Sequence, residues 1–243
     1  MPPDPSLAPA TRLEASGIEA GYGSLQVLWG VDLTVGKGET IVLLGANGAG
    51  KTTFLKALLG LVRVTNGTIR FDGENLTRMR TDQRVRRGLA FMSEIAVFQA
   101  LSIEENIRIG SQTLDAKRAR ARADELYAIF PVLREKRRAA ASSLSGGQRK
   151  MLGIAKALAA DPELLIMDEP SAGLSPLFVR EVVKTLSDLR THGLSLLIAE
   201  QNVSFLDIAD RVFVLEGGRI GFAGLVSDLR QNDALARAYF GLK

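Results

Sequence analysis

The segment Gly45-Ala46-Asn47-Gly48-Ala49-Gly50-Lys51-Thr52-Thr53 decides the fold of this chain, because it matches the pattern G-x-x-x-x-G-K-[ST] in full. An apolar run at 41–44 precedes it and predicts a buried strand, and residues 53–59 follow it with helical character. Glycines let the backbone turn so that its N–H groups face phosphate oxygens, and a helix N-terminus adds partial positive charge. The sequence therefore predicts a phosphate loop between a strand and a helix.

Two side chains of this loop have the chemistry to hold ATP and its metal. Lys51 would neutralise the β- and γ-phosphates, and the Thr52 hydroxyl would be a ligand of Mg²⁺. A glycine-rich turn beside a lysine is the alternative, and the flanking strand and helix count against it. Kinases, GTPases, helicases and transporter motors all carry such a loop, so the class of enzyme depends on the rest of the chain.

A second segment, Leu144-Ser145-Gly146-Gly147-Gln148, lies directly before an Ala/Leu-rich helical stretch at 151–159. Ser145 and Gln148 have the spacing of a capping box, in which each side chain bonds the backbone of the other residue. The glycine pair lowers helix stability, which indicates that something approaches this backbone closely. A capped helix start is also a site for anions, so capping and phosphate binding are compatible interpretations.

A third segment places two carboxylates at the end of an apolar run. Residues 164–167 predict a central parallel strand, and Asp168 and Glu169 follow at its carboxyl end, where α/β sheets bind ligands. Asp168 would hold Mg²⁺ through water, and Glu169 would polarise the attacking water as general base. The alternative, two ordinary acidic residues at a strand exit, is weakened by the presence of Lys51 and of the second segment.

The order of the remaining elements predicts the architecture. Residues 13–35 alternate apolar and polar side chains and 68–73 predict a strand and turn, which indicates an antiparallel sheet. Residues from about 95 to 145 have helical patterns, and strands at 163–168, 195–200 and 211–215 alternate with helices. This alternation predicts a parallel core.

The three segments, in this order, resemble the nucleotide-binding subunit of an ABC transporter, from about Leu13 to the C-terminus. The resemblance implies an α/β P-loop NTPase with a RecA-like parallel-sheet core, an antiparallel β subdomain and an inserted α-helical subdomain at about 95–150. It implies that the segment around Ser145 covers the γ-phosphate bound by a partner subunit, so that two chains are needed. The nucleotide-binding residues it implies are Tyr22, which would stack on adenine, together with Gly45, Ala46, Asn47, Gly48, Ala49, Gly50, Lys51, Thr52, Thr53, Glu94, Ser145, Gly146, Gly147 and Gln148.

The chain departs from the common family pattern at three positions. Glu94 stands where most members have glutamine, Ser175 replaces the usual aspartate, and Gln201 replaces the switch histidine. Glu94 together with Glu200-Gln201-Asn202, and the ending at 236–241, resemble the second ATP-binding subunit of transporters for branched-chain amino acids, urea or short amides. Gln201 does not titrate, so as a catalytic residue it can only hydrogen-bond the γ-phosphate or the lytic water. Glu94 either contacts the nucleotide site or faces the membrane partner.

Composition narrows the class of protein further. The 243 residues can bury one good core, and we expect an ATPase domain at 12–243 behind a disordered, proline-rich tail at 1–11. The chain has no cysteine, no secretory signal and no apolar run near the roughly 20 residues that span a bilayer. We expect a cytoplasmic protein, peripheral on the inner face of the cell membrane, with the pore in other polypeptides.

The net charge of +4 comes partly from basic clusters at 78–87, 117–122 and 134–138. These clusters contain no aromatic residues, and a nucleic-acid surface would interleave both kinds, so we expect no nucleic-acid partner. A solvated helix face is the preferred interpretation, and attraction to an anionic membrane surface is the alternative.

Together these features predict the ATP-hydrolysing motor subunit of an importer, for branched-chain amino acids or a related small polar solute. The implied partners are transmembrane permease subunits, a second ATP-binding subunit, identical or different, and indirectly a periplasmic or surface solute-binding protein. The segment after Glu94, with Val97, Phe98 and Leu101, would pass dimer closure to the permease. The alternatives are a nucleic-acid- or ribosome-associated ABC ATPase and a scaffold for cofactor assembly.

Overall fold

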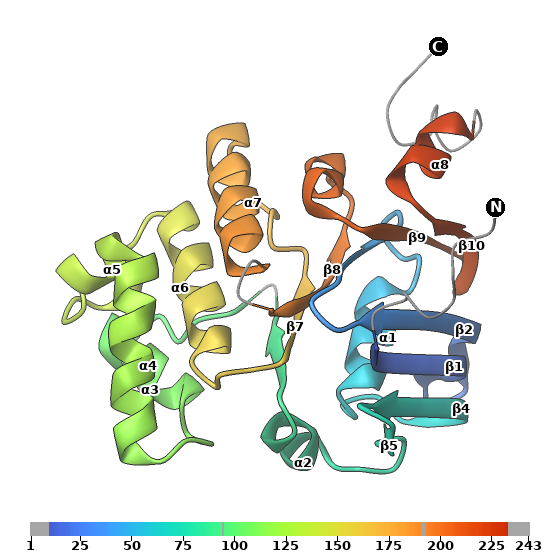
Figure 1. The fold of residues 1–243 in the computed structure, drawn as a ribbon, viewed down its shortest axis with the longest axis horizontal. Coiled ribbons are helices and arrows are strands. Elements are labelled where there is room, and N and C mark those ends of the chain that lie inside the picture. Colours follow the sequence, from blue (N-terminus) through green and yellow to red (C-terminus); the bar gives the residue numbers. More distant parts are fainter. Residues whose placement is uncertain (1–9, 94, 191–192, 233–243) are drawn as a thin grey trace.

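The computed structural model describes residues 10–93, 95–190 and 193–232, which form two sheets and a group of helices (Figure 1). The six-stranded sheet has the order β10-β9-β3-β8-β7-β6, and the four-stranded sheet has the order β2-β1-β4-β5. The strands are β1 Thr11–Tyr22, β2 Leu25–Gly36, β3 Thr40–Leu44, β4 Val64–Phe71, β5 Glu74–Asn75, β6 Leu89–Met92, β7 Leu164–Asp168, β8 Ser195–Glu200, β9 Arg211–Glu216 and β10 Arg219–Gly224.

The six-stranded sheet is the predicted parallel core. Its strands β6, β7, β8, β3 and β9 pair in parallel, and only β10, at the edge, runs antiparallel to its neighbour β9. Every residue of β3, β7 and β8 is buried, because elements cover both faces of a parallel sheet. The predicted α/β P-loop fold class is confirmed.

The four-stranded sheet is antiparallel, as the alternating pattern predicts. Its strand β1 begins at Thr11, one residue inside the segment that was expected to be a disordered tail. Thr11 is opposite Gly36 of β2, and the Ala10 carbonyl accepts a bond from the Lys37 N–H at 2.9 Å. Pairing with β2 therefore orders the chain up to this point, and residues 1–9 lie outside the described part of the chain.

The helices cover the sheets and form a separate lobe. Figure 1 shows α3, α4 and α5 on the side of α6 that faces away from the six-stranded sheet. One apolar cluster joins Ile107, Leu126, Leu133 and Leu152 of this lobe with the sheet residue Met167. The helices are α1 Lys51–Leu58, α2 Thr81–Arg86, α3 Ile103–Gly110, α4 Ala116–Ile129, α5 Pro131–Glu135, α6 Gly146–Leu158, α7 Pro176–Arg190 and α8 Val226–Gln231.

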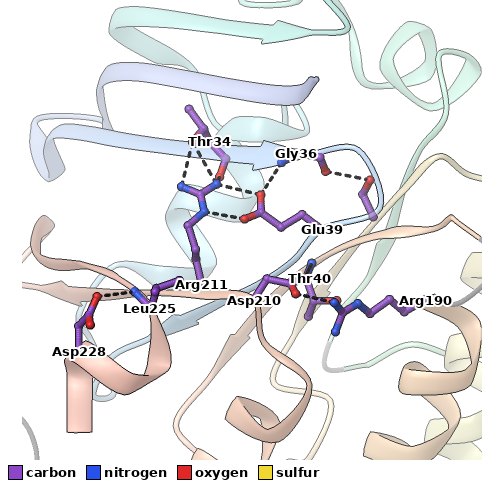
Figure 2. Close-up of polar contacts among 10 residues, drawn as sticks. Thr34, Gly36, Glu39, Thr40, Arg190, Asp210, Arg211, Leu225 and Asp228 are labelled. Carbon is purple, nitrogen blue, oxygen red and sulfur yellow. Dashed lines mark hydrogen bonds and ion pairs between the residues drawn. The ribbon is translucent and has the colours of Figure 1, made fainter. Parts of the chain in front are cut away.

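A polar clamp joins the two sheets at the amino ends of β3 and β9 (Figure 2). The Arg211 guanidinium donates to both carboxylate oxygens of Glu39, at 2.5 and 2.8 Å, and to the carbonyl oxygen of Thr34 in β2, at 3.0 Å. Asp210 accepts from the Thr40 N–H at 2.9 Å and pairs with Arg190. Because these charges neutralise one another in pairs, the clamp stabilises the junction between the sheets.

A buried arginine fixes the far end of α1, the helix that follows the phosphate loop. The guanidinium of Arg84, 1% exposed, donates to the carbonyl oxygens of Ala57 and Leu58 at 3.0 and 2.6 Å, and to those of Thr77 and Met79 at 3.0 Å each. Burial lowers the pKa of Arg84 to about 10, so the side chain is charged at neutral pH. The expectation that the basic cluster at 78–87 is solvated is wrong for Arg84, because the carboxyl end of α1 attracts a cation.

We predict that Arg84→Met lowers the free energy of unfolding by about 3 kcal/mol, because several buried carbonyls lose their donor. Arg86→Met is the matched control: Arg86 lies on the same helix and is exposed, so its loss should change stability by no more than about 0.5 kcal/mol. Chemical denaturation of the two variants measures the difference. Equal effects would show that the buried guanidinium does not stabilise the end of α1.

Candidate functional site

Three strands of the core deliver the predicted site residues to one edge of the sheet. The phosphate loop follows β3, Asp168 ends β7, and Gln201 follows β8. Strand β3 pairs in parallel with β8, and β8 with β7, so their carboxyl ends lie at the same edge. Residues more than a hundred positions apart in the chain meet there, at the place where open α/β sheets bind ligands.

The phosphate loop owes its shape to glycines at defined positions. Gly48 and Gly50 have φ angles of 80° and 108°, a region that disfavours other residues, and α1 begins at Lys51, directly after Gly50. A Cβ atom on Gly45 would lie 2.6 Å from the Leu215 carbonyl oxygen. The loop therefore turns tightly under the N-terminus of α1, as a phosphate-binding loop requires.

The ammonium group of Lys51 lies inside this turn. Its side chain is 4% exposed, and Nζ donates to the carbonyl oxygens of Gly45 and Ala46 at 2.8 and 3.2 Å. Nζ also lies 3.3 Å from Oε1 of Glu169. A buried cation must be paired or hydrogen-bonded, and these three oxygens satisfy it. The positive charge of Lys51 is therefore held inside the loop, where it would attract the phosphate oxygens of a nucleotide.

Thr52 and Asp168 supply two oxygen atoms that could hold a metal ion. The Thr52 hydroxyl donates to Oδ1 of Asp168 at 3.1 Å. Burial raises the pKa of the Asp168 carboxyl, the hydrogen bond from Thr52 opposes this, and the negative charge of Glu169 adds to it. Among the described residues, no group of three or more histidines and carboxylates could hold a metal ion by itself. The pair fits Mg²⁺, which keeps several waters and takes further ligands from phosphates.

Glu169 stands between the phosphate loop and the loop after β8. Its backbone has a φ of 47°, in the left-handed region, and its N–H donates to the Ala199 carbonyl at 2.9 Å. The side-chain amide Nε2 of Gln201 donates to Oε1 of Glu169 at 3.2 Å and to Oδ1 of Asn47 at 2.7 Å. The structure thus brings the predicted Glu169 and Gln201 together and links them to the phosphate loop through Asn47.

Tyr22 lies beside the phosphate loop. It is the last residue of β1, its ring is half-exposed, and its hydroxyl oxygen is 3.5 Å from the Thr53 hydroxyl. An exposed aromatic ring at this distance from the first turn of α1 is available to a flat ligand. Stacking on adenine stays a prediction.

The second segment begins α6 with the predicted capping box. The Gln148 N–H donates to the Ser145 hydroxyl at 3.3 Å, and the Ser145 N–H donates to Oε1 of Gln148 at 3.2 Å. A Cβ on Gly147 would lie 2.3 Å from the ring of Phe178 in α7, whereas a Cβ on Gly146 would have nothing within 4 Å. The contact with Phe178 explains why residue 147 is a glycine. Ser145 and Gly146 are exposed.

Two contacts at this edge have no signal in the sequence. Lys150, on the helix α6 that follows Ser145, donates to the backbone carbonyl of Glu169 at 3.2 Å. The buried carboxylate of Glu200 accepts from backbone groups of two loops. Lys150 belongs to no recognised motif, and Glu200, although part of the segment Glu200-Gln201-Asn202, has no role assigned from the sequence; only the fold shows these contacts.

The remaining predicted residues lie at the margin of the site or outside the described part of the chain. Ser175 is exposed and its carbonyl accepts from the Val179 N–H, in the first turn of α7. Glu94 lies outside the described residues, and so does the ending at 236–241.

This arrangement of loop, lysine and carboxylates defines a P-loop nucleotide hydrolase, and comparison with known proteins gives its family. Residues 28–172 match the ABC transporter family, to which the chain belongs. It is 37% identical to the high-affinity branched-chain amino acid transport ATP-binding protein BraG of Pseudomonas aeruginosa, over 90% of this chain and 95% of that protein. It is 36% identical to the lipopolysaccharide export system ATP-binding protein LptB of Haemophilus influenzae, over 94% of this chain and 97% of that protein.

Solved structures agree on the fold. The crystal structure of a nucleotide-free ATP-binding cassette from an ABC transporter superposes with a TM-score of 0.83, covering 94% of this chain and 98% of that one. At 22% sequence identity this likeness concerns the fold alone. The predicted family and the predicted enzyme class are confirmed: the chain is an ABC-type ATPase, the motor subunit of a transporter. In the described ranges, no helix combines the length and the apolar character needed to cross a bilayer.

We predict that Asp168→Asn raises the melting temperature in metal-free buffer by roughly 2 °C, because it removes a buried negative charge. A carboxyl whose pKa is raised by folding destabilises the protein above its ordinary pKa. The gain should therefore be largest near neutral pH and vanish as the pH falls towards about 4. Mg²⁺ with ATP should stabilise the wild type and not the variant. Thermal melts at several pH values, with and without Mg-ATP, test both statements, and a lower melting temperature at neutral pH contradicts the first.

Proposed function

We propose that this chain drives an importer of branched-chain amino acids or of a related small polar solute. The observation that supports this most directly is the 37% identity to BraG over almost the whole of both chains. LptB, named for lipopolysaccharide export, has similar identity, so overall similarity does not distinguish import from export. The departures at Glu94 and Gln201, which resemble the amino-acid branch, favour import.

Hydrolysis at this site divides among the residues that the sheet brings together. Lys51 binds the β- and γ-phosphates, and Thr52 and Asp168 would hold Mg²⁺, which would supply further positive charge against the phosphates. Glu169 accepts the proton of the attacking water as general base, a role worth a factor of about 10²–10⁴. Gln201, whose amide already contacts Glu169, orients the water or the γ-phosphate. Tyr22 stacks on the adenine ring.

The site needs a second chain. Ser145 and Gly146, exposed at the capped start of α6, bind the γ-phosphate held by a partner subunit, which is a second copy or a different ATP-binding subunit. Because both surfaces contact the γ-phosphate only in the closed pair, ATP favours closure through its differential affinity for that state.

The exposed apolar side chains of Ile95 and Phe98, next to the helical lobe, are suited to contact a permease subunit at the inner face of the membrane. Val97, which the sequence places in the same transmitting segment as Phe98, is half-buried and packs against the core. Fewer apolar side chains of this segment are therefore available to a permease than the sequence suggested. The names of BraG and LptB both refer to transport systems, which favours transport over the non-transport alternatives.

We predict that deleting the gene reduces uptake of branched-chain amino acids by the source organism. Uptake of radiolabelled leucine, with glucose uptake as the control, measures this. Wild-type protein should restore leucine uptake, whereas Glu169→Gln should not, because ATP would bind without being hydrolysed at a useful rate. Normal leucine, urea and short-amide uptake in the deletion strain would overturn the proposed substrate class, and in vitro ATPase activity would still stand.

We predict that Ser145 acts across the dimer. Neither Ser145→Arg nor Lys51→Ala homodimers should hydrolyse ATP, but a mixed dimer contains one composite site with both residues intact. Mixed dimers isolated with two different affinity tags should therefore recover part of the wild-type activity. If the natural partner is a different ATP-binding subunit, one substitution is introduced into each subunit of the heterodimer. Isolated mixed dimers without activity would contradict a shared site.

A further inference from the structure

Glu200, the last residue of β8, is a buried carboxylate with no role in the mechanism above. It is 2% exposed. Its Oε1 accepts from the Ser171 N–H at 2.7 Å, and its Oε2 accepts from the N–H groups of Gln201 and Asn202 at 3.1 and 3.2 Å. An ionised carboxylate accepts several bonds and donates none, so it matches three converging N–H groups better than any amide or hydroxyl does.

The donors to Glu200 belong to the two loops that present Glu169 and Gln201. Ser171 lies two residues after Glu169, in the loop that leaves β7. Gln201 and Asn202 begin the loop that leaves β8. The backbone pairing of β7 with β8 ends where Asp168 is opposite Ala199 and the Glu169 N–H reaches the Ala199 carbonyl. Beyond that point the Glu200 side chain continues the connection between the two loops.

Glu169 needs support on both sides, because its φ of 47° lies in a region that is unfavourable for a residue with a Cβ atom. The bond to Ala199 fixes the backbone at Glu169, and the bond from Ser171 to Glu200 fixes the chain two residues later. With both loops held by one carboxylate, Oε1 of Glu169 lies 3.2 Å from the Gln201 amide. A shift of either loop would change this distance.

We propose that Glu200 is a positioning residue for ATP hydrolysis: its carboxylate holds the loops of Glu169 and Gln201 in register at the reacting γ-phosphate. Glu200 touches neither nucleotide nor water in this role and acts through the two side chains that do. The inference rests on the proposed roles of Glu169 and Gln201.

Glu200→Gln tests the inference with the least change of shape. The amide keeps one acceptor oxygen but presents N–H to a backbone N–H, so at least one loop loses its bond. We expect kcat to fall about tenfold or more, since small misplacements of catalytic groups cost factors up to about 10². The Kd for Mg-ATP should stay within about twofold, because Lys51 and the phosphate loop are untouched. Glu200→Asp keeps the charge on a shorter side chain and should have an intermediate kcat, which provides a second variant if Glu200→Gln folds poorly.

Glu39→Gln is the matched control, because Glu39 is also a buried carboxylate of the same sheet that accepts from backbone and side-chain N–H groups. It lies in the clamp at the opposite end of the strands (Figure 2). We expect it to lower the melting temperature and to leave kcat of the folded protein unchanged. If Glu200 only stabilised the fold, both variants would behave alike, and the proposal would be wrong.

A double-mutant cycle separates this inference from the proposed function. In a Glu169→Gln background, Glu200→Gln should lower kcat by a smaller factor than it does in the wild type, because one of the two side chains through which it acts is already disabled. If the double variant lost kcat by the product of the two separate factors, the positioning role would be wrong. An unchanged kcat in Glu169→Gln alone would instead overturn the proposed role of Glu169, and the two failures are thus distinguishable.

Discussion

The buried ammonium of Lys51 is the constraint on which the site depends. It lies at the first residue of α1, bonded to two carbonyls of its own loop and paired with Glu169 from a strand two places away in the sheet. A cation in this position is tolerated only while oxygen atoms surround it. The loop, the helix and the Asp168-Glu169 strand end must therefore keep their relative places. Arg84 serves the same helix at its other end, where it satisfies the carbonyls of Ala57 and Leu58.

The parallel sheet solves the problem of bringing these oxygens together. In β3, β7 and β8 every residue is buried, and the polar ones stand at strand ends: Thr40 and Ser195 at amino ends, Asp168 and Glu200 at carboxyl ends. The carboxylates of these strands thus stand at the carboxyl ends, and parallel pairing places those ends and the loops after them at one edge. Glu200 follows this rule: it is the last residue of β8, and its carboxylate accepts from backbone N–H groups at the same edge.

Short sequence patterns predicted the strands of the core and the start of α6. Buried apolar runs gave the strand 195–200 at its observed bounds and β7 to within one residue, and the Ser145–Gln148 spacing gave the capping box. Contacts between distant side chains left no such signal. Arg84 was assigned to a solvated cluster, because an arginine that caps a buried helix end has the same sequence neighbours as an exposed one. The contact of Gly147 with Phe178 and the bridge from Gln201 to Asn47 likewise arise only when α6, α7 and the loops are packed together.

Helix α6 carries both the exposed segment that we propose to contact a partner's nucleotide and a contact with the backbone of Glu169. Its capped start is exposed, whereas Lys150, one turn further along, donates to the backbone carbonyl of Glu169. Phe178 packs against Gly147 between these points, and a larger residue at 147 would push the helix away from α7. The surface that we propose to face another chain is therefore attached, through a single turn of helix, to the backbone of Glu169, the proposed general base. A displacement of α6 cannot leave Glu169 unaffected, because the same turn carries both contacts.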